Sequence, residues 1–131
     1  MAINVFFDGG KKVNAVIHGF TVKTDQPIRS GGENTAPAPF NLFLASLATC
    51  AGFYVKAFCD QRNIPADDIT LSMDYEVNSV THLIGKIVIE IHVPDDFPDK
   101  YDTALINAAA VCAVKRHLNP EIQHIITVKR K

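Results

Sequence analysis

An uncharged stretch of 22 residues, Asn34 to Val55, constrains the fold of this chain more than any other feature. About 20 apolar residues suffice to span a bilayer, so the stretch is long enough to be a membrane helix. It also contains prolines and polar residues, and nothing else in the sequence favours insertion into a membrane. We therefore predict a helix that is buried on all sides within a folded protein, and no membrane partner.

The boundaries of this helix follow from the residues that flank it. Pro39 suits the first helical turn, where its missing N–H is harmless, and Asn63-Ile64-Pro65 ends the helix near Arg62. A helix of about 24 residues is about 36 Å long, which the rest of a short chain can hardly surround. Apolar side chains nevertheless cover nearly its whole circumference: Leu42, Phe43, Leu44, Leu47, Phe53, Tyr54, Val55 and Phe58. We therefore predict a homodimer with this helix at its centre.

The rest of the chain shows strand patterns and one further helix. Apolar and polar residues alternate through Ile69–Val77 and again through Ile87–Val93, and the short link between them predicts an antiparallel hairpin. The other predicted elements are strands at Ile3–Phe6, Val13–Val22 and Ile122–Val128, and a helix from Tyr101 to about Leu118. Helices and strands are segregated along the chain. This order predicts an α+β fold with a mainly antiparallel sheet, in a single domain over residues 1–131.

The charge of the chain excludes several classes of partner. The formal net charge is −1 and the one basic cluster is formed by the last three residues, so we expect no nucleic acid and no anionic membrane. The first residues lack the basic and apolar segments of a signal peptide. Three cysteines without an export signal favour the cytoplasm, where thiols are usually reactive, metal-bound or buried.

The spacing of possible ligands gives no support to a metal or an organic cofactor. The five histidines lack the His-x-x-x-His spacing of a helical metal site, and no two cysteines form a Cys-x-x-Cys pair. Gly31-Gly32 lacks the spacing of a phosphate loop, and no serine stands in a Gly-x-Ser-x-Gly motif. We therefore expect neither a metal nor a cofactor.

The cysteines are the strongest candidates for chemistry. Cys50 lies about three turns inside the first helix, Cys59 is nine residues further on and points away from it, and Cys112 lies in the second long helix. Each alone also fits a small buried hydrophobic residue. A peroxide is attacked by a thiolate, whereas a free thiol with a pKa of about 8.5 is mostly protonated at neutral pH. Cys50 lies too deep in its helix to benefit from the helix dipole, so its reactivity requires a nearby cation.

Two segments around these cysteines resemble a known family. Residues 31–50, GGENTAPAPFNLFLASLATC, resemble the Gly-rich loop, Pro-x-Glu-Leu helix start, run of small and leucine residues, and first redox cysteine of the OsmC/Ohr family. Residues 112–118, CAVKRHL, resemble the helical element that carries the second cysteine of that family. The predicted order of elements matches the family along essentially the whole chain. The general OsmC-like branch resembles this sequence more than the hydroperoxide-resistance branch does.

This resemblance implies both a fold and a chemistry. The implied fold is an intertwined homodimer, with two six-stranded sheets around long central helices and a site at the subunit interface. The implied function is that of a thiol-dependent peroxidase in oxidative stress defence, in which Cys50 reduces an organic hydroperoxide and Cys112 then forms a disulfide with it. An external dithiol would reduce the pair, and no metal or organic cofactor would take part.

The sequence also departs from the family pattern. Asn41 stands where active members have a glutamate, and an amide cannot supply that counter-charge. No residue aligns securely with the arginine by which the family lowers the pKa of its first cysteine. Arg29 is the only arginine before Cys50 and is the first candidate for the activating cation. The weaker candidates are Lys11, Lys12 and Lys23.

Because of these departures, two other functions stay open. One is a catalytically weak or inactive OsmC-like dimer that binds a small apolar ligand in an interface pocket near Phe40, Phe43 and Tyr54. The other is a redox sensor that uses the same cysteines. Loss of free thiols on exposure to an organic hydroperoxide distinguishes the enzyme from the ligand-binding protein.

Overall fold

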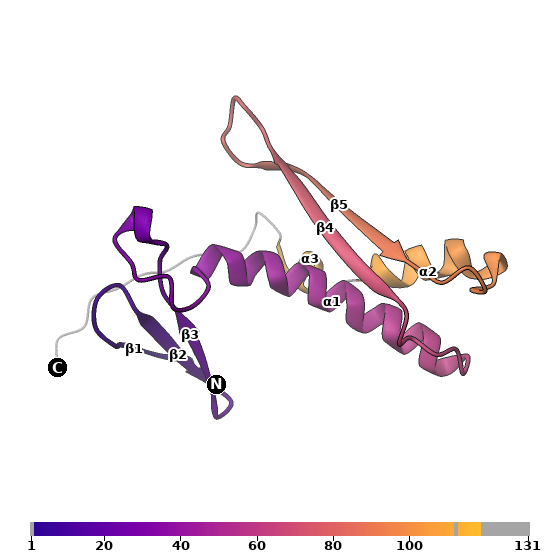
Figure 1. The fold of residues 1–131 in the computed structure, drawn as a ribbon, viewed down its shortest axis with the longest axis horizontal. Helices are drawn as coiled ribbons and strands as arrows, with labels where there is room; N and C mark the ends of the chain where they lie inside the picture. Colours follow the sequence, from indigo (N-terminus) through magenta and orange to yellow (C-terminus); the bar gives the residue numbers. More distant parts are fainter. Residues whose placement is uncertain (1, 112, 119–131) are drawn as a thin grey trace. The chain divides into compact units, whose positions relative to one another are not determined.

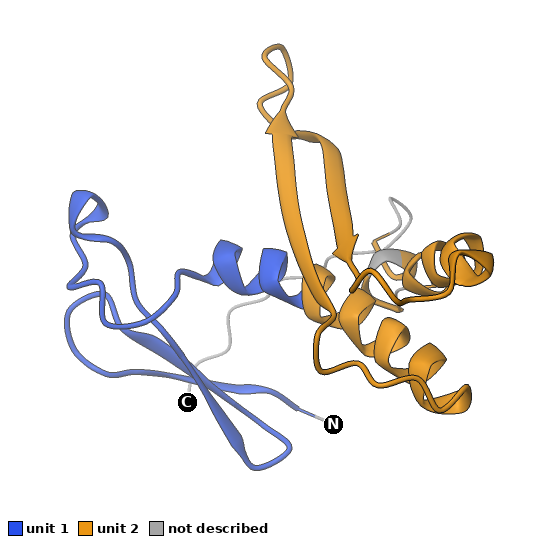
Figure 2. Ribbon diagram, turned by 45° about the vertical axis from the view of Figure 1, so that its right-hand side comes forward, with its two compact units in different colours: residues 1–46 blue, residues 47–131 orange. Residues whose placement is uncertain are grey.

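The structure is a computed structural model that describes residues 2–111 and 113–118. Its elements follow the order three strands, a long helix, two strands and a short helical segment (Figure 1). The chain divides into two compact units, residues 1–46 and residues 47–131 (Figure 2). We call them unit 1 and unit 2 and describe each by itself. The predicted last strand, Ile122–Val128, lies outside the described residues.

Unit 1 contains an antiparallel sheet in the order β1-β2-β3. The strands are β1 (Asn4–Phe7), β2 (Val13–Ile17) and β3 (Phe20–Thr24). The prediction of one strand over Val13–Val22 was wrong, because a turn at His18 and Gly19 divides it. Both turn residues have positive φ, 49° and 81°, as a two-residue hairpin turn of type I′ requires. Glycine adopts that conformation without strain.

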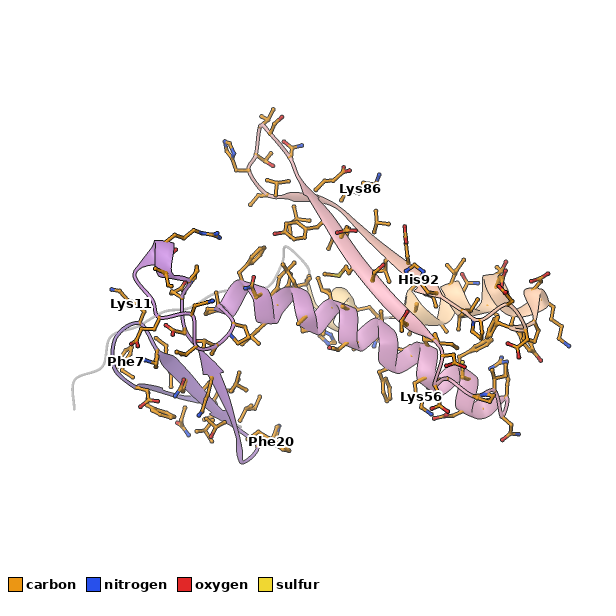
Figure 3. All side chains as sticks on the ribbon, in the orientation of Figure 1. Phe7, Lys11, Phe20, Lys56, Lys86 and His92 are labelled. Carbon is orange, nitrogen blue, oxygen red and sulfur yellow. The ribbon has the colours of Figure 1, made fainter. Side chains whose placement is uncertain are left out.

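The apolar face of this sheet has little cover within unit 1. Val5 pairs with Ala15 and Ala15 with Val22, so these side chains share one face. Phe7 is 84% exposed and Phe20 is 74% exposed (Figure 3). The side chains that are buried among the described residues of unit 1 are polar, namely those of Asn14 and Asp25. This unit therefore has no apolar core of its own within residues 2–46.

Helix α1 (Pro39–Gln61) begins in unit 1 and continues into unit 2. Its bounds confirm the predicted helix to within one residue. The buried side chains follow one stripe along the helix: Leu47, Ala51, Val55, Phe58 and Cys59. Phe53 is 64% exposed, so the described residues leave part of the surface of α1 open. Burial of this helix on all sides was expected only with a partner subunit and stays a prediction. By length and composition α1 could also cross a membrane, but core helices of soluble proteins meet the same criterion.

Unit 2 packs α1 against a hairpin and a short helix. The hairpin pairs β4 (Thr70–Val77) with β5 (Ile84–His92) in an antiparallel register that sets Met73 opposite Ile89. This confirms the predicted hairpin. The apolar core joins Val55, Phe58 and Cys59 of α1 to Phe97 and Leu105. Burial of these side chains is the main source of stability within unit 2.

The predicted second long helix is shorter than expected. A 3-10 turn, η2 (Asp99–Tyr101), leads into α2 (Asp102–Ala109), and α3 (Ala113–Arg116) follows after a break. At the break Val111 N–H donates to the Ala108 carbonyl at 3.2 Å, the three-residue spacing of a tighter turn. The continuous helix predicted from Tyr101 to Leu118 is therefore interrupted after Ala109. The mixture of helices and antiparallel sheets confirms the α+β class.

Candidate functional site

Two of the three cysteines lie on α1 in different surroundings. Cys50 is partly exposed, whereas Cys59 is 0% exposed and belongs to the core of unit 2. Burial raises the pKa of the Cys59 thiol, and the Asp60 carboxylate raises it further. Cys59 is therefore held protonated and out of reach of solvent. Of these two residues, Cys50 is the one that is partly exposed to solvent.

Cys112 lies outside the described residues, so its pairing with Cys50 stays a prediction. The residues on either side of it belong to the end of the turn after α2 and to the start of α3. Val111 is 48% exposed.

The candidate cations all belong to unit 1, but they differ in their contacts. Lys12 Nζ donates to Glu33 Oε1 at 2.7 Å, and this hydrogen bond raises the pKa of Lys12. Lys11 (Figure 3) places its side-chain stem beside Gly31, where a Cβ would lie 3.6 Å from the Lys11 Cε. Arg29 lies in the 3-10 turn η1 (Ile28–Ser30), and Lys23 is exposed on β3. The assignment of one of them to Cys50 stays a prediction.

A buried carboxylate in unit 1 was not predicted from the sequence. Asp25 is 0% exposed, and its Oδ2 accepts hydrogen bonds from the Thr35 hydroxyl at 2.7 Å and the Thr35 N–H at 3.0 Å. Its Oδ1 accepts the Gln26 N–H at 2.7 Å. These bonds, the Thr35 hydroxyl first, lower the pKa of Asp25 to about 2. An aspartate just before a proline- and glycine-rich loop is the signal that could have suggested this role.

The predicted supporting and pocket residues are divided between the units. Asn41 lies exposed in the first turn of α1, where its N–H donates to the Ala38 carbonyl at 2.9 Å. Phe40 and Phe43 stack in unit 1, with ring centroids 5.9 Å apart. In unit 2, Tyr54 meets Phe53 edge to face at 5.3 Å. A common pocket of Phe40, Phe43 and Tyr54 stays a prediction.

Unit 2 contains an open apolar cavity of about 640 Å³. Its wall is formed mainly by aliphatic side chains of β5, α1 and α2, and the charged group in it is Lys86 of β5 (Figure 3). The lining residues are Leu47, Ile84, Gly85, Lys86, Ile87, Ile89, Ile91, Ile106, Ala109, Ala110 and Leu118. A cavity of this size and composition is suited to apolar groups. Among residues 2–111 and 113–118, no group of three or more ligand side chains could hold a metal ion.

The family model for OsmC-like protein matches residues 32–127, a range that reaches from the loop before α1 into the C-terminal segment. This chain belongs to the OsmC-like family. No curated protein resembles the sequence closely enough to count as a match. The family assignment confirms the resemblance inferred from residues 31–50 and 112–118.

Solved structures support the same fold for this OsmC-like protein. A protein designated an osmotic stress induced and detoxification response protein, from Psychrobacter arcticus 273-4, has a TM-score of 0.75 and 20% identity, over 92% of this chain and 90% of that chain. The organic hydroperoxide resistance protein OsmC of Legionella pneumophila has a TM-score of 0.57 and 18% identity, over 92% and 90%. OhrB of Bacillus subtilis, an organic hydroperoxide resistance protein, has a TM-score of 0.53 and 20% identity, over 92% and 93%.

Proposed function

We propose that this OsmC-like protein is a thiol-dependent peroxidase that reduces organic hydroperoxides through Cys50 and Cys112. The observation that carries the proposal is the contrast along α1, where Cys50 is partly exposed and Cys59 is sealed in the core. A thiol must be accessible to meet a peroxide, and it must be able to ionise. The names of the similar structures, two of which are hydroperoxide resistance proteins, support the substrate class.

The proposed reaction has three balanced steps. The Cys50 thiolate attacks one oxygen of the hydroperoxide, the O–O bond breaks, and the organic fragment leaves as an alcohol after taking up a proton. The resulting sulfenic acid condenses with the Cys112 thiol, which forms a disulfide and releases water. An external dithiol then exchanges with this disulfide, so both cysteines return to thiols and the dithiol is oxidised.

The same proposal includes a homodimer built from one OsmC-like domain per chain, residues 1–131. Its support is the apolar surface that each unit leaves open. Unit 1 exposes Phe7 and Phe20, and unit 2 exposes Phe53 of α1 and contains an open apolar cavity. Soluble monomers rarely leave apolar surface of this kind uncovered. A second copy of the chain is the occupant that we propose, with the active site at the boundary.

The proposed activator of Cys50 is a cation from unit 1. Lys12 is engaged by Glu33 at 2.7 Å, which makes it the weaker candidate. Arg29 remains the first choice, and Lys11 is the second. A cation beside a thiol lowers its pKa, because the thiolate is stabilised relative to the neutral form.

The apolar cavity of unit 2 favours a second candidate function. A cavity lined by aliphatic side chains and one lysine can hold a small apolar ligand without any redox step. In that case Asn41, in place of the family glutamate, would leave Cys50 without efficient activation. A sensor that is oxidised at Cys50 but turns over slowly lies between the two candidates.

Thiol counting distinguishes these functions. The reduced protein is mixed with cumene hydroperoxide and its free thiols are counted, in the parent chain, in Cys50→Ser and in Cys59→Ala as the matched control on the same helix. We expect the parent and the Cys59→Ala chain to lose two thiols each and Cys50→Ser to lose none. Unchanged thiols in the parent at millimolar peroxide would contradict the peroxidase. Rapid oxidation without turnover in the presence of a dithiol would favour the sensor.

A further inference from the structure

We propose that Arg62 excludes Cys59 from thiol–disulfide exchange, because its guanidinium covers the core of unit 2 at the end of α1. This role makes Arg62 a selectivity determinant among the cysteines of the chain. The consequence for catalysis rests on the proposed function, since a competing thiol matters only where Cys50 and Cys112 form a disulfide. The cover itself concerns residues of unit 2 alone and can be tested without a peroxide.

The backbone at the end of α1 fixes the position of Arg62. Asn63 has a φ of 55°, and its N–H donates to the Asp60 carbonyl at 3.3 Å. The Ile64 N–H donates to the Cys59 carbonyl at 2.9 Å, and the Arg62 N–H donates to the same carbonyl at 3.1 Å. This is the pattern of a Schellman motif, in which a residue in the left-handed conformation ends the helix. The backbone thus holds Arg62 immediately after the turn that carries Cys59.

The side chain of Arg62 lies over the ring of Phe58. Its guanidinium carbon is 3.6 Å from the Phe58 ring centroid, and its Nη1 donates to the Phe58 carbonyl at 3.2 Å. A guanidinium is planar and weakly hydrated, so it can lie against an aromatic ring and still keep contact with water. Phe58 is 7% exposed, whereas Arg62 is exposed to solvent. The guanidinium therefore shields one face of this ring from solvent.

A second ring extends this cover to the segment before α2. The ring of Tyr101, in η2, has its centroid 5.8 Å from that of Phe58, and the two planes meet at 80°. The guanidinium carbon of Arg62 is 5.6 Å from the Tyr101 centroid. A cation within about 6 Å of an aromatic centroid is attracted by the ring. We call Phe58, Arg62 and Tyr101 the arginine–aromatic cluster, which ties the end of α1 to the segment that leads into α2.

The arginine–aromatic cluster borders the core that contains Cys59. Cys59 is 0% exposed and belongs to the same buried group of side chains as Phe58. Tyr101 is partly buried and packs against this group. A reagent can reach Cys59 only when part of the core opens, and helix ends open more readily than helix interiors. An opening that separates the end of α1 from η2 must break the contacts of Arg62 with both rings.

The sign of the expected effect separates cover from charge. Burial is the main cause that raises the pKa of the Cys59 thiol, and the Asp60 carboxylate raises it further. The positive charges of Lys56 and Arg62 act in the opposite direction. Loss of the Arg62 charge alone would therefore raise this pKa and slow exchange, since the thiolate is the reactive form. Loss of the cover makes opening more frequent and speeds exchange.

The test uses the full chain with Cys50→Ser and Cys112→Ser, so that Cys59 is the one remaining thiol. The rate at which this background chain reacts with the disulfide reagent DTNB is measured at pH 7. The Cys59 thiolate attacks the reagent, a mixed disulfide forms, and one thionitrobenzoate anion leaves and is counted. We expect Arg62→Ala to react about fivefold faster than the background chain, the change in the opening equilibrium for the loss of one cation–π contact.

Two further positions provide matched controls. Lys56→Ala removes a positive charge from the same helix, where Lys56 pairs with Asp60, and should leave the rate within about twofold of the background chain. Tyr101→Phe keeps the ring and should leave the rate unchanged. Tyr101→Leu removes the ring and should raise the rate about threefold.

The urea dependence of the rate separates local opening from global unfolding. Local opening exposes little surface, so at low urea the rate should depend on urea much less than the unfolding equilibrium does. The inference is overturned if Arg62→Ala reacts no faster than Lys56→Ala, or if its faster reaction has the urea dependence of global unfolding. Equal rates in Tyr101→Leu and Tyr101→Phe would also overturn it. Failure of the parent chain to lose thiols to cumene hydroperoxide would refute the peroxidase instead and leave these rates unaffected.

Discussion

Unit 2 is organised around apolar side chains, whereas the buried side chains in the described part of unit 1 are Asn14 and Asp25. In unit 2, Val55, Phe58 and Leu105 form a core between α1 and α2. In unit 1, hydrogen bonds of Asp25 and the close backbone contact at Gly32 fix the loop over residues 25–37. The apolar face of the sheet is left open among the described residues of this unit. Unit 2 is therefore stabilised mainly by the packing of apolar side chains, whereas unit 1 is stabilised by backbone geometry and by the hydrogen bonds of one buried carboxylate.

The largest expected effect tests the apolar side of this comparison. Leu105 is 3% exposed and packs in the core of unit 2, so Leu105→Ala should lower the free energy of unfolding by about 2–5 kcal/mol. Val80, at the hairpin tip, is 83% exposed, so Val80→Ala should change it by less than about 0.5 kcal/mol. Urea unfolding at pH 7 measures both. Similar losses in the two variants would show that unit 2 is not organised around this core.

The next effect concerns backbone contact in unit 1. A Cβ on Gly32 would lie 2.0 Å from the Gln26 carbonyl oxygen, so Gly32→Ala must displace the loop and should cost about 1–3 kcal/mol of unfolding free energy. Gly85→Ala is the control in unit 2, since its Cβ would come no closer than 3.5 Å to Asn78. Thermal unfolding of the two variants provides the comparison. A Gly32→Ala chain as stable as the parent would mean that the two halves of the loop do not touch.

A third effect depends on pH. The pKa of Asp25 falls from 3.8 to about 2 on folding, mainly through the Thr35 hydroxyl. Because the folded value is the lower one, the stabilisation is fully present above about pH 4 and is lost as pH falls toward 2. We expect the urea midpoint of the parent to fall over this range. The midpoint of Asp25→Asn should fall less, because this variant has no carboxylate at position 25 to protonate. Identical pH profiles from pH 6 to pH 2 would show that Asp25 does not carry it.

The smallest effect is a stabilisation within α1. Gly52 lies in the interior of the helix, and a Cβ there would meet the Leu71 Cδ1 at 4.0 Å, an ordinary contact. Gly52→Ala should therefore raise the free energy of unfolding by about 0.5–1 kcal/mol, because alanine loses less backbone entropy in a helix. Chemical unfolding at pH 7 is the measurement. A destabilised variant would show that the added methyl group does not fit between α1 and Leu71 of β4.

The contrast between unit 1 and unit 2 also explains which elements could be predicted from the sequence. Periodic apolar patterns located α1 and the β4–β5 hairpin closely, because those elements bury one face against neighbours in unit 2. The turn at His18 and Gly19 was missed, since apolar residues continue on both sides of it. The break after Ala109 was missed because the residues that follow also favour a helix.

The candidate site could be predicted only in part. The sequence located Cys50 on a long apolar helix and separated it from Cys59, because helical geometry alone decides where those side chains point. It did not find the buried Asp25 carboxylate, because the bonds between Asp25 and Thr35 depend on the backbone conformation of all the residues between them. The contacts of the proposed dimer involve a second chain, and no periodic pattern in one sequence specifies them.

Peptide mapping of the oxidised protein tests the central claim most directly. The reduced chain is treated with one equivalent of cumene hydroperoxide, digested without a reductant and examined by mass spectrometry. We predict a peptide pair in which a disulfide joins Cys50 to Cys112. Its mass should be about 2 Da below the summed masses of the two reduced peptides, because two hydrogens are lost. An unchanged mass, or a disulfide that includes Cys59, would contradict the account.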